Sequence, residues 1–273
     1  MNIWIYVIIL AAVQGVAEFL PISSSGHLAI LGALFGFSED RSLALGILLH
    51  AGSLLAILVF YFKTLLGFLK PQGWHLAGMV ILGTIPAGIA GVALKYSGLD
   101  EKLFGEPMIV GFAFLLTATL LRLSEKPKLI ARAPEVPPTP LEKITVRETL
   151  IIGISQMFAI LPGLSRSGTT ISAGILSGVN REAAGTFSFL LAIPAIGGAA
   201  FLELLSLLRD GIPADQGGVT PLLMAVGFLV SAVISYFSLA LLTRLIKRGR
   251  LSYFSYYLYA AGVAVILWQL ASI

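Results

Sequence analysis

The chain has 273 residues, of which 57% are apolar and 12% are charged, and its mean hydropathy is +0.94. Soluble domains contain roughly 45–50% apolar and roughly 25% charged residues, so this composition excludes a water-soluble protein. The formal net charge is +4 and cysteine is absent, which excludes disulfides and thiolate metal sites. Because the basic residues gather in a few short connections, we expect the lipid bilayer, and no nucleic acid, as a partner.

Apolar segments follow one another along the chain, and a helix that crosses a membrane needs about 20 such residues. Six segments predict transmembrane helices, at residues 43–62, 76–94, 107–121, 186–208, 221–242 and 252–271. Two others, at 3–20 and 149–161, run into proline, glycine and serine at 21–27 and 162–168. Because such a break ends one apolar helix before a second short one begins, these segments predict two re-entrant helical hairpins. The expected fold is an all-α integral membrane protein.

Charges in the connections predict the orientation, because cytoplasmic loops carry an excess of Lys and Arg. The basic connections, expected inside, are residues 63–75, 122–148 and 243–251. The net negative connections, expected outside, are residues 95–106 and 209–220. This assignment requires the segments at 3–37 and 149–179 to enter and leave on one face, and it places both termini outside.

The two halves of the chain resemble each other at a separation of 142 residues. The identical pairs are Gln14 with Gln156, Ala17 with Ala159, Ser23 with Ser165, Ser25 with Ser167, Gly26 with Gly168, Gly32 with Gly174, Leu34 with Leu176 and Gly36 with Gly178. Each half holds one hairpin and three spans, an odd number, so the halves are expected to be inverted relative to each other. The sequence thus predicts two repeats, at 1–121 and 149–273, joined by a proline-rich cytoplasmic linker at 122–148.

Polar residues gather at the two breaks, which are expected to meet near the middle of the membrane. The first break offers Gln14, Glu18, Ser23, Ser24, Ser25 and His27, and the second offers Gln156, Ser165, Arg166, Ser167, Thr169 and Thr170. Helices that begin after residues 23–26 and after 162–165 would point unpaired N–H groups at the site, so each break predicts an anion site. Arg166 adds a permanent charge whose planar shape suits phosphate oxygens. Two facing anion sites suit a ligand with two linked phosphates.

The side chains of Glu18, His27 and His50 can titrate or bind metal. Glu18 can hold a metal or accept a proton, and His27 titrates near neutrality beside the break. Charges at this depth are usually functional, so Glu18 and Arg166 are expected to belong to a site. By contrast, His50 stands alone in the middle of a span, and we expect a structural role for it.

Two motifs resemble those of a known family. The segments Q-G-V-A-E-F-L-P-I-S-S-S-G-H at 14–27 and P-G-L-S-R-S-G-T-T at 162–170 are similar to the signatures of bacterial undecaprenyl-diphosphatases, also called bacitracin resistance proteins. The resemblance implies an integral enzyme of the bacterial plasma membrane, with a site that opens to the outer surface. It would hydrolyse undecaprenyl diphosphate to undecaprenyl phosphate and phosphate, recycling the lipid carrier for peptidoglycan and other envelope polymers.

The resemblance also implies roles for individual residues. The catalytic residues would be Glu18, Ser24, His27 and Arg166. The phosphate-binding residues would be Gln14, Ser23, Ser25, Ser165, Ser167 and Thr170, to which the position of Gln156 at the second break adds a further candidate. A divalent cation, Mg²⁺ or Ca²⁺, would bind at Glu18, although Gln14 stands where many members carry a second carboxylate. Whether His27 or Ser24 acts as nucleophile stays open.

Two questions remain open at the level of sequence. Inverted repeats with broken helices also occur in secondary transporters, so a carrier of organic phosphates or lipids is the alternative function, and a channel is a weaker one. The apolar outer faces permit a homodimer without requiring one.

Overall fold

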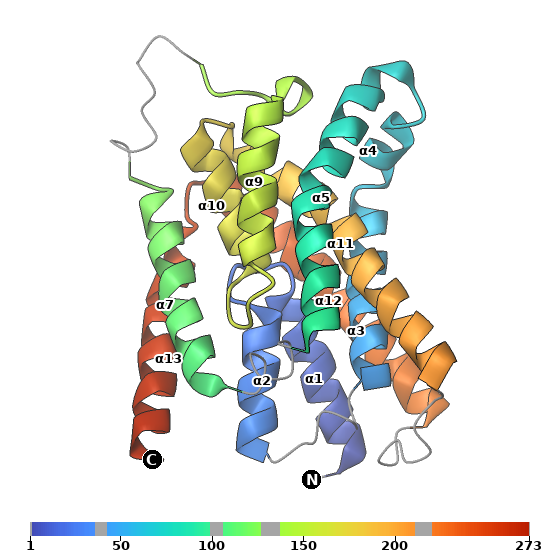
Figure 1. Cartoon of the computed structure of the whole chain (residues 1–273), viewed down its shortest axis with the longest axis vertical. Coiled ribbons are helices and arrows are strands. Elements are labelled where there is room, and N and C mark those ends of the chain that lie inside the picture. The colour runs from blue at the N-terminus through green and yellow to red at the C-terminus, as the bar shows by residue number, and fades with distance from the viewer. Residues whose placement is uncertain (1, 36–42, 99–105, 127–136, 211–219, 273) are drawn as a thin grey trace.

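The computed structural model describes the chain except for residues 1, 36–42, 99–105, 127–136, 211–219 and 273. Across the described residues the protein is helical, with no β-strand (Figure 1). The α-helices are α1 (Ile3–Ala17), α2 (Ser24–Phe35), α3 (Leu43–Phe60), α4 (Phe62–Gly67), α5 (Trp74–Ser97), α7 (Pro107–Leu123), α9 (Val146–Phe158), α10 (Arg166–Ser177), α11 (Arg181–Asp210), α12 (Pro221–Lys247) and α13 (Ser252–Ala271). Two short 3₁₀ turns are η2 (Pro71–Gly73) and η3 (Leu141–Lys143).

The helices agree with the apolar segments of the sequence. Within the described residues, four helical segments are long and apolar enough to cross a membrane: Pro71–Ser97, Arg181–Leu202, Pro221–Lys247 and Ser252–Ala271. Shorter apolar helices cover Ile3–Ala17, Ser24–Leu34, Leu45–Phe60 and Pro107–Leu123. The expectation of an all-α membrane protein is therefore confirmed.

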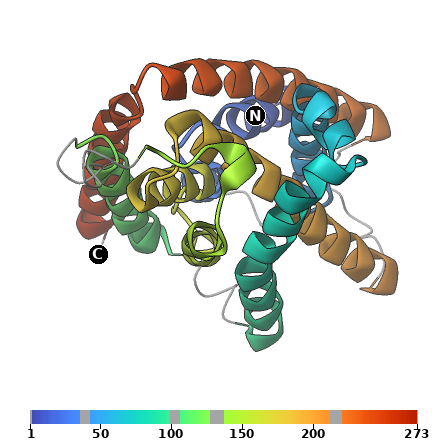
Figure 2. The ribbon, with the colours of Figure 1, turned by 90° about the horizontal axis from the view of Figure 1, so that it is seen from above.

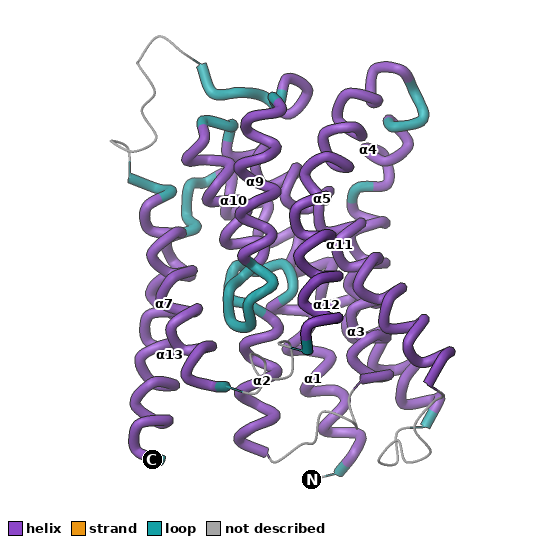
Figure 3. The backbone as a smooth tube through the Cα atoms, viewed as in Figure 1, coloured by secondary structure: helices purple, strands orange, loops and turns teal. Residues whose placement is uncertain are grey.

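Both proline-containing breaks end a helix. Helix α1 ends at Ala17 and α2 begins at Ser24, whereas α9 ends at Phe158 and α10 begins at Arg166. Figure 1 shows that α1 and α2 occupy the lower part of the molecule and α9 and α10 the upper part, with both connecting loops near mid-height. The same two loops stand out beside each other when the chain is coloured by secondary structure (Figure 3). The breaks thus bring two hairpins together from opposite ends.

The long helices surround these hairpins. Seen from above, α12 runs along one side of the molecule (Figure 2). Helices α13 and α7 lie at one end of α12, and α3, α11 and α5 lie toward its other end. The largest fully buried side chains include Phe19, Phe114, Phe187 and Phe189, and the rings of Phe19 and Phe189 meet edge to face at 6.1 Å. Many large apolar side chains on the long helices are exposed instead, such as Phe237 on α12 at 67%. An apolar outer face of this kind suits a lipid surrounding.

A side-chain cap fixes the start of α9. Thr145 and Glu148 form a capping box at the start of α9, with Thr145 Oγ1 accepting from the Glu148 N–H and the Glu148 carboxylate accepting from the Thr145 N–H. The Glu148 carboxylate also accepts from Thr139 Oγ1 at 2.7 Å. These bonds attach the described end of the linker to the second hairpin.

Candidate functional site

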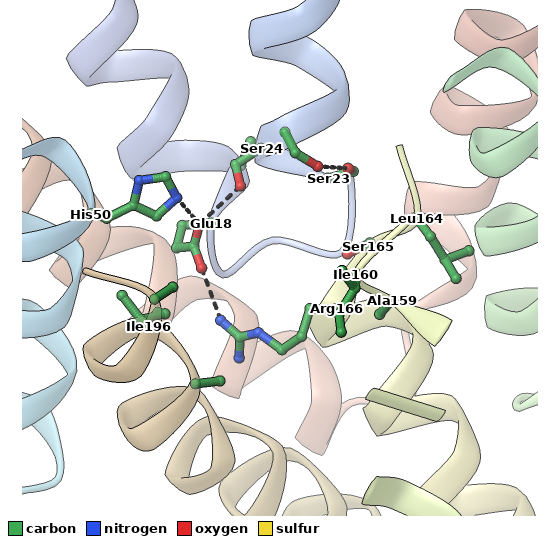
Figure 4. A pocket seen from close by; sticks show the side chains of 14 residues that line it. Glu18, Ser23, Ser24, His50, Ala159, Ile160, Leu164, Ser165, Arg166 and Ile196 are labelled. Carbon is green, nitrogen blue, oxygen red and sulfur yellow. Dashed lines mark hydrogen bonds and ion pairs between the residues drawn. The ribbon is translucent and has the colours of Figure 1, made fainter. Parts of the chain in front are cut away.

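A cavity of about 270 Å³ lies where the two hairpin loops approach α3 and α11 (Figure 4). Its polar lining residues are Glu18, Ser23, Ser24 and Ser25 of the first hairpin, Ser165 and Arg166 of the second, and His50 of α3. Its apolar lining residues include Ala159, Ile160, Ala195, Ile196 and Ala199. The lining therefore offers polar side chains to charged groups and apolar side chains to hydrocarbon.

An ion pair joins the two hairpins inside this cavity. Arg166 Nη2 donates to Glu18 Oε1 at 3.0 Å, between side chains that are only 15% and 8% exposed. Arg166 Nη1 donates to the main-chain carbonyl of Ser188 on α11, at 3.4 Å. Because the charges cancel, the pair can persist in an apolar surrounding, where either charge alone would be costly.

The second oxygen of the Glu18 carboxylate has other neighbours. Glu18 Oε2 accepts from Gln14 Nε2 at 2.9 Å and from Ser24 Oγ at 2.8 Å. His50 Nε2 lies 3.8 Å from the same oxygen (Figure 4). The carboxylate thus gathers groups from α1, the start of α2, and α3.

The serines of both breaks cap helices in the same way. Ser23 Oγ accepts from the Gly26 N–H and Ser165 Oγ accepts from the Gly168 N–H, each at 3.2 Å. In each hairpin a second serine hydroxyl lies 3.3 Å from the capping one. The expectation that the first short helix begins after Gly26 was wrong, because Ser23 takes a left-handed conformation, with φ of 72°, and α2 begins at the next residue. Residues of both helix starts, Ser24 and Ser25 of α2 and Arg166 of α10, line the cavity, so the positive dipole ends of both helices lie beside it.

Several residues expected at the site lie outside the cavity lining. The described cavity does not include Gln14, Gln156, Ser167 or Thr170. Thr170 Oγ1 donates to the Arg166 main-chain carbonyl at 2.7 Å and lies 2.6 Å from Ser188 Oγ, so it supports the first turn of α10. Gln156 is 2% exposed, and among the described residues neither of its amide atoms has a hydrogen-bond partner.

His27 also points away from the cavity. Its Nδ1 donates to the Ser23 carbonyl at 2.7 Å, so in the neutral ring its Nε2 accepts from the Tyr257 hydroxyl at 2.6 Å. The imidazole stacks on the Tyr257 ring, with centroids 5.7 Å apart, and its centroid lies 5.1 Å from that of the Phe114 ring. Both ring nitrogens are therefore occupied by protein groups, and the proposed catalytic role of His27 stays a prediction.

The contacts of His50 with Glu18 and of Ser188 with Arg166 were not predicted from the sequence. His50 lies four residues after Gly46 and three before Ser53, so one face of α3 carries small and polar residues. Ser53 Oγ lies 2.9 Å from Ser235 Oγ of α12, so the Ser53 end of this face packs inside the protein, whereas a Cβ at Gly46 would meet nothing within 4 Å. The spacing of His50 and Ser53 was a usable signal that His50 lies near the packed side of α3.

The fold and the cavity define an integral membrane protein with an internal cavity that polar and charged side chains line. The chain belongs to the family described as bacitracin resistance protein BacA, whose profile matches residues 7–264. It is 37% identical over 264 residues to an undecaprenyl-diphosphatase of Carboxydothermus hydrogenoformans, covering 97% of each chain. It is 38% identical over 275 residues to one from Bacteroides thetaiotaomicron, covering 98% of this chain and 99% of that one.

Proposed function

We propose that this protein hydrolyses undecaprenyl diphosphate to undecaprenyl phosphate and inorganic phosphate, recycling the lipid carrier for peptidoglycan and other envelope polymers. The relatives above carry the name of this enzyme, and they match along nearly the whole chain. The observation that carries the proposal is the Glu18–Arg166 pair between two capped helix starts in one cavity. A guanidinium and helix N-termini are the groups that bind a diphosphate.

The apolar lining suits the other part of such a substrate. Ala195, Ile196 and Ala199 of α11 line the cavity together with the charged groups. A prenyl chain gains by staying in hydrocarbon, so we infer that the tail leaves sideways between the helices while the head group enters the cavity.

We further infer six transmembrane helices and two re-entrant hairpins, arranged as inverted repeats at 1–121 and 149–273 around a cytoplasmic linker at 122–148. The matched serine caps and the opposite entry of the hairpins support this arrangement. The protein would lie in the bacterial plasma membrane with both termini outside and the site open to the outer surface. The exposed apolar faces would allow a homodimer.

The chemistry is displacement at the distal phosphorus. Arg166 and the N–H groups at the start of α10 would stabilise the charge that spreads over the transferring phosphoryl oxygens. The bond from the distal phosphorus to the bridging oxygen breaks, and its electron pair leaves with undecaprenyl phosphate. A water molecule supplies the oxygen that ends in inorganic phosphate.

Two nucleophiles could begin this displacement, the Ser24 hydroxyl or a water molecule. Ser24 Oγ already donates to Glu18 Oε2, which could accept its proton while the oxygen attacks and forms a phosphoserine. Water would then attack this phosphorus, and Ser24 Oγ would leave and take back the proton from Glu18. A water molecule that replaces the hydroxyl at the carboxylate could attack directly. We favour Ser24 over His27 as the nucleophile, because Ser24 lines the cavity whereas both nitrogens of His27 are bonded elsewhere.

The donor atoms suit a divalent cation that shares the diphosphate oxygens. Among the described residues no three His, Cys, Asp or Glu side chains cluster, so a cage made only of protein does not fit. However, Mg²⁺ usually binds one or two carboxylates together with substrate phosphates. Glu18 would supply the carboxylate, and beside it Gln14 Oε1 is buried without a hydrogen-bond partner in the described chain. When bound, Mg²⁺ or Ca²⁺ would neutralise phosphate charge.

The test is phosphate release from a C55 diphosphate by the purified protein in detergent, with and without a chelator. We expect hydrolysis that falls by about a hundredfold or more in Arg166→Ala, since a lost charge-stabilising donor costs about this much. The control is Lys247→Gln, which breaks the exposed Lys247–Glu182 pair, 3.0 Å long, and should leave the rate unchanged. Lipid movement across proteoliposomes without any hydrolysis would instead establish a transporter.

A further inference from the structure

His50 presents an unusual combination of a fixed ring and a free nitrogen. Its Nδ1 lies 2.9 Å from the Gly46 carbonyl oxygen, which can only accept, so Nδ1 carries the proton. The lone pair of the neutral ring is therefore on Nε2, which faces the cavity 3.8 Å from Glu18 Oε2. Metal-binding histidines are commonly held in this way, with one nitrogen donating to a backbone carbonyl and the other free for the ion.

Two oxygen donors lie beside this nitrogen. Metal–ligand bonds are about 2.0–2.6 Å long, so one ion can contact both Nε2 of His50 and Oε2 of Glu18 across their 3.8 Å separation. Ser24 Oγ lies 2.8 Å from the same carboxylate oxygen, and its hydroxyl can turn its proton away and offer a lone pair. Arg166 binds the opposite oxygen of the carboxylate, Oε1, and Gln14 Nε2 donates to Oε2 at 2.9 Å from the α1 side.

We infer that His50 is a direct ligand of the divalent ion at this site, together with Glu18 and Ser24. The inference rests on the proposed function, because the diphosphate would supply the remaining ligands and offset the charge of Arg166. An imidazole nitrogen favours transition ions, whereas Ca²⁺ prefers oxygen. The site should therefore accept Mn²⁺ in competition with Ca²⁺.

Pulsed electron paramagnetic resonance of bound Mn²⁺ tests this, because it detects the ¹⁴N nucleus of a coordinated imidazole. The full-length protein is loaded in detergent with Mn²⁺ and methylenediphosphonate, a diphosphate analogue that has no bond to hydrolyse. We expect ¹⁴N coupling in the wild type and in His27→Gln, and its loss in His50→Gln. The dissociation constant for Mn²⁺ should rise about tenfold or more in His50→Gln, and the preference should shift toward Ca²⁺.

Incorporation of ¹⁵N-histidine into the wild type gives the same answer without a substitution, because a histidine ligand changes the coupling to that of ¹⁵N. Absence of nitrogen coupling in the wild type, or coupling that persists in His50→Gln, would overturn the inference. Hydrolysis by the same wild-type sample is measured in parallel. If the protein hydrolyses the substrate but shows no nitrogen coupling, His50 is not a ligand and the proposed function stands. If it shows nitrogen coupling but no hydrolysis, the proposed function is wrong and the ion site stands.

Discussion

The Glu18 carboxylate and the Arg166 guanidinium neutralise each other inside an apolar molecule. They come from different hairpins, so their 3.0 Å bond also connects two segments far apart in the chain. Removing one partner of a buried pair leaves an uncompensated charge and costs about 3–5 kcal/mol, whereas replacing both partners is often nearly neutral. A diphosphate in the cavity would offer Arg166 a second anionic partner.

A double-mutant cycle measures this dependence. We expect Glu18→Gln and Arg166→Gln each to lower the thermal stability of the purified protein markedly. The double variant should recover most of the loss, because no unpaired charge remains. Additive losses in the double variant would show that the two side chains are stabilised independently.

The residues of the site were predictable to different degrees. Glu18 and Arg166 are charges in apolar segments, and their cost in a membrane marks them from the sequence alone. The capping role of Ser23 and Ser165 was less visible, because a serine that binds phosphate and one that caps a helix give the same pattern. Whether His50 reaches the cavity depends on which face of α3 turns inward, and the packing of α3 against α12 decides that.

The two hairpins contact each other through glycine. A Cβ at Gly26 would lie 2.9 Å from the Gly163 Cα in the second hairpin and 2.5 Å from the Phe114 ring. A Cβ at Gly168 would lie 3.2 Å from the Pro21 Cβ in the first hairpin. Each helix start therefore packs against the loop of the other hairpin, and this contact keeps Glu18 within reach of the second hairpin.

Gly26→Ala should separate the hairpins. Main-chain atoms of the second loop cannot yield easily, so we expect a loss of stability of about 1–3 kcal/mol and a strongly reduced rate of hydrolysis. Gly88→Ala in α5 is the matched control, because a Cβ there meets nothing within 4 Å and alanine favours the helix. Thermal unfolding and phosphate release of both variants check this, and a Gly26→Ala protein that behaves like Gly88→Ala would contradict the proposed contact.

Proline and glycine made the helix breaks predictable, but not the exact residues at which the helices begin and end. The break at 159–165 begins after α9 and contains Pro162 and Gly163, as the sequence indicated. In the first hairpin the start of α2 was misplaced, because only the tertiary structure reveals that Ser23 adopts a φ of 72°. Residues other than glycine rarely do so, and no sequence rule places such a residue.

Helices from the first and second halves of the chain pack on one another throughout the molecule. Helix α3 packs against α12, α5 against α9, and α7 against α13. Thr117 of α7 also accepts a hydrogen bond from the Ser165 N–H at 3.1 Å, so a first-half helix supports the second hairpin. The two sequence repeats are therefore not independently packed units, and the cavity depends on both.

The distribution of basic loops predicts the orientation of the whole molecule, and introduced cysteines can measure it. The natural sequence has none, so each labelling signal comes from one chosen position. Glu142 in η3 and Ser97 at the end of α5 are both exposed and flank opposite predicted sides. With a membrane-impermeant maleimide on intact spheroplasts, Ser97→Cys should be labelled at once, and Glu142→Cys only after the membrane is permeabilised. Labelling of Glu142→Cys in intact spheroplasts would invert the orientation, and the site would then have to be reassigned to the cytoplasmic face.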